Sequence, residues 1–60
     1  MSLDIIRKTA LNYYYGEGMT LARQYLRARV ESGDITWEEH RRIMVGLLHL
    51  AGVDLSLATI

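Results

Sequence analysis

Residues able to do acid–base or metal chemistry are few in this sequence. The 60 residues include two histidines and no cysteine. A carboxylate-bridged metal bundle needs a glutamate three residues before each histidine, but Trp37 occupies that position before His40 and Gly46 occupies it before His49. The zinc-protease pattern His-Glu-x-x-His is also absent. We therefore predict no metal site.

Nucleophilic and phosphate-binding chemistry is not favoured either. Without cysteine a nucleophile would have to be serine or threonine, and none of these has a spacing that implies a base beside it. The Gly-Glu-Gly segment at 16–18 lacks the Gly-Lys-Ser/Thr that completes a phosphate loop, which favours a flexible joint. Helix capping and the helix dipole account for the adjacent Glu38 and Glu39. We expect neither enzymatic activity nor a cofactor.

Three consecutive tyrosines, Tyr13, Tyr14 and Tyr15, offer binding chemistry instead. They cover more than half a helical turn, so they cannot all point into one core. In one interpretation Tyr13 and Tyr14 pack along an apolar stripe, and Tyr15 leans on the exposed side. In the other, Tyr15 and Leu11 form an apolar patch that binds a partner, since tyrosine is frequent among interface hot spots.

Basic residues on the second helical segment suggest a rival function. Thr20, Arg23, Gln24 and Arg27 share one side of that segment and suit phosphates and base edges. Glu17 in the preceding joint and a formal net charge of zero count against binding to DNA. A small helix-turn-helix DNA-binding regulator that uses this helix is the alternative.

Two polar residues fall near the middle of apolar arcs, and each leaves two interpretations open. Arg29 either extends its guanidinium to water beside the negative helix end or reaches across an interface to a carboxylate or carbonyl. His40 is either a neutral imidazole at the edge of the core or a pH switch or ligand. His49 is expected to be a plain surface residue.

The elements that position these residues are helices at about 3–15, 21–32 and 37–51. Ser2 can cap the first, Gly16 ends it in a left-handed conformation, and Thr20 caps the second. Gly33 ends the second helix and makes the turn of a helical hairpin. No proline interrupts any of the three.

Thr36-Trp37-Glu38-Glu39 has the form of a capping box, the strongest local signal in the chain. From there the third helix is predicted to end near Ala51, because Gly52 repeats the capping pattern. The tail 53–60 alternates apolar and polar residues. We expect it to be extended or a single turn that folds its leucines back on the helices.

Helical phase predicts where each helix is buried. We expect the third helix to bury a broad arc and Trp37 to lie in the hairpin or dimer core. That arc comprises Trp37, His40, Ile43, Met44, Leu47, Leu48, Leu50 and Ala51. The second helix is apolar over more than half its circumference. In the first, Ile5, Leu11 and Tyr15 lie outside the stripe of Leu3, Ile6, Ala10, Tyr13 and Tyr14.

These surfaces exceed what one small chain can cover. A domain of this size buries only about 60% of its unfolded surface, and half of these residues are hydrophobic. We therefore predict an all-α fold, a small helical hairpin or three-helix domain completed as a bundle by homodimerisation. With no signal peptide and no apolar run of about 20 residues, we expect a soluble, cytoplasmic protein that does not enter a membrane.

The function predicted from the sequence is protein binding without catalysis, as an adaptor, inhibitor or regulator of a larger protein. The partners are a second copy and an unidentified protein. The predicted partner-binding residues are Leu11, Tyr14 and Tyr15 as apolar anchors, with Arg23 and Arg27 as a charged rim.

Overall fold

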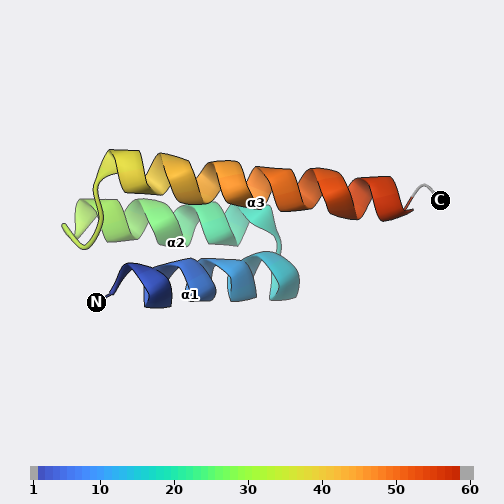
Figure 1. The fold of residues 1–60 in the computed structure, drawn as a ribbon. Coiled ribbons are helices and arrows are strands. Elements are labelled where there is room, and N and C mark those ends of the chain that lie inside the picture. The colour runs from blue at the N-terminus through green and yellow to red at the C-terminus, as the bar shows by residue number, and fades with distance from the viewer. Residues whose placement is uncertain (1, 59–60) are drawn as a thin grey trace.

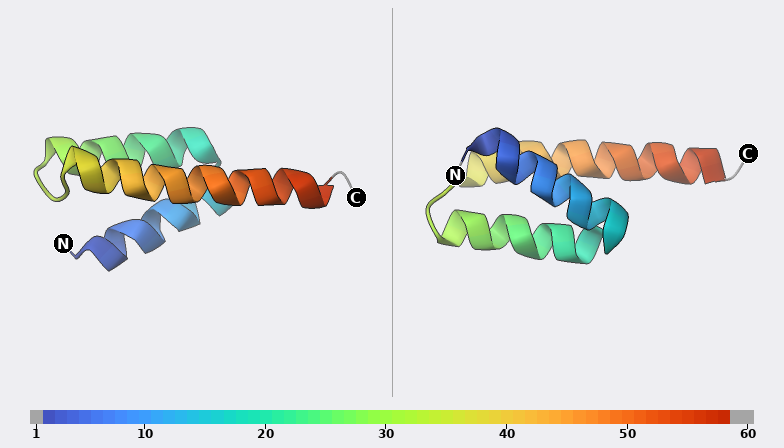
Figure 2. Two further views of the ribbon diagram at one scale, coloured as in Figure 1. Left: turned by 45° about the horizontal axis from the view of Figure 1, so that its top comes forward. Right: turned by 90° about the horizontal axis from the view of Figure 1, so that it is seen from below.

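Three helices make up the part of the chain that the computed structural model describes, residues 2–58. They are α1 (Leu3–Gly16), α2 (Met19–Glu31) and α3 (Trp37–Ala58). Along this range α2 runs back beside α1, α3 runs back beside α2, and α1 crosses the pair on one side (Figures 1 and 2). The body measures 41 × 20 × 17 Å, elongated because α3 is much the longest helix. The predicted all-α class and three-helix architecture are confirmed.

Two helices begin at side-chain caps predicted from the sequence. The amide of Ile5 donates to the Ser2 hydroxyl oxygen at 3.3 Å. At the start of α3 the Glu39 amide donates to Thr36 Oγ1 at 3.1 Å, and the Thr36 amide donates to Glu39 Oε1 at 2.9 Å. These bonds satisfy amides that have no partner within the helix, so the capping box is confirmed.

The turn between α2 and α3 lies at Gly33, as predicted. Gly33 has φ of 85°, a left-handed conformation that glycine adopts without steric cost. The Asp34 carboxylate accepts from the Ser32 hydroxyl at 2.8 Å and pairs with the Arg29 guanidinium at 3.1 Å. Side chains on both sides of the glycine therefore hold the turn.

The joint between α1 and α2 differs from the prediction. Gly18, not Gly16, takes the positive φ, at 109°, and it is the residue at the N-cap of α2. Gly16 stays helical as the last residue of α1, and Thr20 lies inside α2 and caps nothing. The joint thus contains only Glu17 and Gly18, because one glycine is enough to reverse the chain.

The core is a small cluster of side chains from all three helices and the second turn. Its buried members are Ile6, Ala10, Ala22, Leu26, Ile35, Ile43, Met44 and Leu47. Ile35 lies in the turn between α2 and α3, yet it is 5% exposed and completes the core beside the start of α3. Helical periodicity could not reveal this residue, since it belongs to no helix.

Trp37 lies outside this core, so the predicted burial within the hairpin is wrong, and burial in a dimer core stays a prediction. Its side chain is 60% exposed and makes an edge contact with the His40 ring, at 5.2 Å between centroids. The buried side of α3 is centred on Ile43 and Leu47, and Trp37 falls at the margin of that arc. Ile35 fills the core at this end instead.

The end of α3 is the largest departure from the predicted structure. The helix continues through Gly52 to Ala58, so residues 53–58 are helical and form no separate tail; residues 59 and 60 lie outside the described range. Gly52 has no positive φ and therefore does not act as a left-handed cap. The residues after it include no proline, and leucine and alanine favour helix. Leu55 and Leu57 point away from the core and are exposed.

Candidate interaction surfaces

The tyrosines of α1 divide between two neighbouring helices. Tyr13 packs on Tyr25 of α2, with ring centroids 5.3 Å apart. Tyr14 packs against the core and its hydroxyl donates to Asp54 Oδ2 of α3 at 2.9 Å. Tyr15 contacts the Tyr14 ring at 4.8 Å but is itself 59% exposed. Of the three, Tyr15 is the one that presents most of its ring to solvent.

The contact between Tyr14 and Asp54 ties the end of α1 to the last part of α3. The hydrogen bond to Asp54, with partial burial and the negative charge of the carboxylate, raises the pKa of the Tyr14 phenol. The phenol thus stays protonated and neutral, and it continues to donate the hydrogen bond to Asp54. This contact joins residues 40 positions apart and fixes α3 beyond Gly52.

Leu11 is less isolated than its sequence position suggested. It packs against the core, and it lines a groove between α1 and α3. The residues of this α1–α3 groove are Arg7, Leu11, Arg42, Ile43, Gly46, Leu47 and Leu50. Leu11, although outside the predicted apolar stripe, therefore contributes to the fold itself, whereas Tyr15, one turn further along, does lie on the exposed side.

The basic residues of α2 lie on its solvent side, as predicted. Arg23 and Arg27 are both exposed, and Arg27 pairs with Glu31 at 3.1 Å. They come from a different helix than the tyrosines. Helix-turn-helix motifs cross at about 90–120°, whereas α2 returns alongside α1 as a hairpin (Figure 1).

The two polar residues with open interpretations have partners within the described part of the chain. Arg29 pairs with Asp34 and lies 5.6 Å from the centroid of the Tyr25 ring, so the carboxylate that it reaches belongs to its own turn. Burial lowers the pKa of His40 below its ordinary value of 6.5, which favours the neutral imidazole at pH 7. His49 is exposed, as expected.

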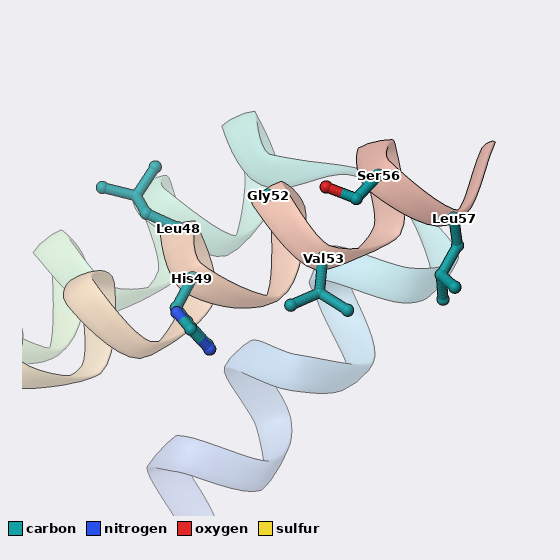
Figure 3. Close-up of a pocket in the computed structure, with 6 residues that line it drawn as sticks. All are labelled: Leu48, His49, Gly52, Val53, Ser56 and Leu57. Atoms are coloured by element: carbon teal, nitrogen blue, oxygen red, sulfur yellow. The ribbon is translucent and has the colours of Figure 1, made fainter. Parts of the chain in front are cut away.

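An apolar strip lies exposed on the solvent side of α3. We call Val45, Leu48, Gly52 and Leu55 the outer face of α3. Their spacing of three, four and three residues places them on one side of the helix. Val45, Leu48 and Leu55 are 59%, 54% and 69% exposed. Figure 3 shows a shallow hollow lined by α3 alone that borders this strip at Leu48 and Gly52; Val53 and Leu57 extend from another side of the helix than Leu48.

Most of this outer face is not predicted by the sequence patterns. Helical phase predicts Leu48 in the buried arc, and the capping pattern at Gly52 ends the predicted helix before Leu55, so the repeat is divided in two. Once α3 is known to reach Ala58, the repeat at 45, 48, 52 and 55 is visible in the sequence itself. The missing information was the length of the helix.

Charge is distributed unevenly along α3. At its N-terminal end Glu38 pairs with Arg42 at 2.9 Å, and Arg41 is exposed beside them. Arg41 belongs to none of the ion pairs found within residues 2–58. The last turn of α3 carries no basic residue to balance the negative end of the helix dipole.

Neither a metal-binding cluster nor a membrane-spanning helix is found in the described residues. Within residues 2–58 no three histidine, aspartate or glutamate side chains gather closely enough to hold a metal ion. No helix of this range is both long and apolar enough to cross a bilayer. Comparison with protein-family models, with curated proteins and with solved structures finds no match to the chain.

Proposed function

We propose that this chain is a non-enzymatic protein-interaction module that forms a homodimer through the outer face of α3. The observation that carries the proposal is the exposure of Val45, Leu48 and Leu55 along one strip of the longest helix. Burying a leucine or valine contributes roughly 1.5–3 kcal/mol. A second copy that covers the strip gains this contribution twice, once for each chain.

The size of the core supports the same proposal. Eight buried side chains, two of them alanine, form the core. The chain has no cysteine for a disulfide, and residues 2–58 hold no cluster of side chains that could bind a metal ion. Below roughly 70–80 residues a single core rarely supplies more than about 3–5 kcal/mol. Dimerisation is the remaining means by which such a chain adds buried apolar area.

For the target protein we propose the surface of α1 and its joint, on the side where Tyr15 is exposed. Tyr15 is the central anchor, Leu11 and Tyr14 provide the apolar floor beneath it, and Arg23 and Arg27 form a charged rim on α2. Large, rigid aromatic side chains at a partly apolar surface are typical of interface hot spots. This surface lies on other helices than the strip assigned to the dimer.

Two leucine-sized residues with equal exposure allow a matched test of the dimer. Leu48 on α3 and Ile5 on α1 are each 54% exposed. We expect Leu48→Lys to reduce the mass measured by light scattering from dimer to monomer, because a charge then enters the buried seam. Ile5→Lys is expected to leave the dimer mass unchanged. A monomeric wild-type chain, or equal behaviour of the two variants, contradicts the proposal.

The target surface is tested with the double variant Leu11→Ala, Tyr15→Ala. It should keep the dimer mass and lose the proteins that the wild-type chain retains in a pull-down. A double variant that becomes monomeric or unfolds assigns these residues to the fold or the dimer, and the chosen surface is then wrong. Leu48→Lys in the same pull-down separates loss of the dimer from loss of the target.

DNA binding, the alternative function, is excluded or established by gel retardation at low and moderate salt. The proposal predicts no sequence-specific retardation. Specific retardation that disappears in the Arg23→Ala, Arg27→Ala variant would overturn the class of function.

A further inference from the structure

We infer that the two copies pair through antiparallel α3 helices, related by a two-fold axis at the height of residue 50. This inference rests on the proposed homodimer and specifies its partner surface, a second copy of the same strip. In a two-fold interface, residue i of one chain meets residue j of the other, and j meets i. An axis at residue 50 pairs each position with the one equally far on the other side.

The outer face of α3 is symmetric about that position. Val45 and Leu55 are each five residues from Leu50, and Leu48 and Gly52 are each two residues from it. Antiparallel pairing therefore sets Val45 against the partner's Leu55 and Leu48 against the partner's Gly52. Each of these contacts occurs twice. The Leu50 side chain is half-buried on the side of α3 opposite the outer face. The two-fold axis therefore passes beside the outer face, level with Leu50 along the helix.

Gly52 gives this register its shape complementarity. Glycine inside a helix is less favourable than alanine, because it loses more backbone freedom on folding. A methyl group added at Gly52 would meet nothing within 4 Å in the single chain, so its packing in the chain does not require glycine. A leucine opposite Gly52 has room for its side chain where two helices approach closely.

Charge favours the antiparallel direction over the parallel one. Parallel pairing in register brings Arg41 against the partner's Arg41 and Glu38 against the partner's Glu38, at the N-terminal end of the same strip. Antiparallel pairing separates the two Arg41 residues, nine positions from the axis on opposite sides, by about 27 Å along the helices. Like charges at that distance are largely screened at physiological salt.

The uncompensated end of α3 adds attraction in the same direction. The last turn of α3 holds no basic residue, and Arg41 has no ion pair within residues 2–58. Antiparallel pairing brings Arg41 beside the last turn of the partner's α3. A cation near a helix C-terminus is stabilising, because it balances the negative end of the helix dipole. The second copy thus supplies the charge that this chain lacks at its own helix end.

The absence of cysteine in the chain makes a direct test of this register possible. Two single variants, Val45→Cys and Leu55→Cys, are mixed and allowed to exchange in a glutathione redox buffer, and the disulfide-linked dimers are sorted by mass. Antiparallel pairing predicts that the mixed product, joining position 45 to position 55, greatly exceeds its random proportion. A disulfide needs Cα atoms within about 7 Å, whereas two copies of position 45 would be separated by about 15 Å along the axis.

The outcomes separate the inference from the proposed dimer. Dominant 45–45 and 55–55 products would show parallel pairing and overturn the inference. A dimeric wild-type mass with random products would place the dimer on another surface, which overturns both this inference and the assignment to the outer face, while homodimerisation itself stands. A monomeric wild-type mass would overturn all of them. Arg23→Cys mixed with Val45→Cys is the control and should give random products.

A charge exchange provides a second readout of the same register. Val45→Glu alone should yield a monomer by light scattering, because an unpaired carboxylate then faces the partner's Leu55. Adding Leu55→Lys should restore the dimer, because each new carboxylate then faces a lysine of the partner. The two positions are ten residues apart on one helix, about 15 Å, so they do not pair within a chain. Failure of the double variant to recover the dimer would contradict the antiparallel register.

Discussion

The hydroxyl of Thr36 illustrates how a single residue determines where a helix begins. It accepts from the Glu39 amide, while the carboxylate of Glu39 accepts from the amide of Thr36. Both bonds are local, which is why the sequence alone identified them. Ser2 is identified by the same reasoning, because a cap depends only on residues three positions apart.

Replacing Thr36 with alanine should lower the free energy of unfolding by about 1 kcal/mol, since one amide in the first turn loses its partner. Thr20 provides the matched control. It lies within α2 and makes no capping bond, so Thr20→Ala should leave stability nearly unchanged. Chemical denaturation of the two variants measures the difference, and equal effects would show that the capping box contributes little.

The imidazole of His40 predicts a dependence of stability on pH. Burial lowers the pKa of His40 in the folded chain below its ordinary value of 6.5. Below that pH the unfolded chain therefore binds a proton that the folded chain does not, and stability falls as the pH falls, until the folded imidazole is protonated too. His40→Gln should reduce this loss, whereas the exposed His49→Gln is the control. An unchanged slope between about pH 5 and 6.5 in His40→Gln would contradict the effect.

At the scale of elements, helix starts were easier to predict than the end of α3. A glycine after an apolar run either caps a helix in the left-handed conformation or continues it, and its neighbours do not decide between the two. Gly33 caps and Gly52 continues. The helix beyond Gly52 is fixed by a hydrogen bond from Tyr14 of α1, a contact that no local pattern contains.

This difference between the two glycines gives opposite predictions for the same substitution. Gly33→Ala should destabilise by roughly 1–2 kcal/mol, because an alanine must adopt φ of 85°. Gly52→Ala should increase helix content and stabilise the chain by about 1 kcal/mol. The Gly52 variant is best measured in the Leu48→Lys background, so that contacts between copies do not contribute. Destabilisation by Gly52→Ala there would mean that α3 ends at Gly52.

Long-range packing also explains the errors at the candidate sites. Helical phase correctly assigned the solvent side of α2, with Arg23 and Arg27, and the exposed position of Tyr15. It did not predict that Leu11 packs against the core or that Trp37 lies outside the hairpin core, because phase gives directions around one helix and not which neighbour lies there. Ile35 fills the core near Trp37, and Leu11 lies in the groove between α1 and α3.

At the scale of the whole molecule, a small core coexists with a long apolar strip. The core consists of eight side chains, and Val45, Leu48 and Leu55 of α3 remain mostly in solvent. If a second copy covers the strip, folding and association are coupled. Stability then depends on protein concentration by mass action.

The most direct test of the central claim is the unfolding temperature of the wild-type chain over about a hundredfold range of concentration. The proposed homodimer predicts that the unfolding temperature rises steadily with concentration, because dilution favours dissociated and unfolded chains. Leu48→Lys should remove this dependence, and Ile5→Lys should retain it. A wild-type unfolding temperature that stays constant over the whole range would contradict the homodimer and leave a three-helix monomer.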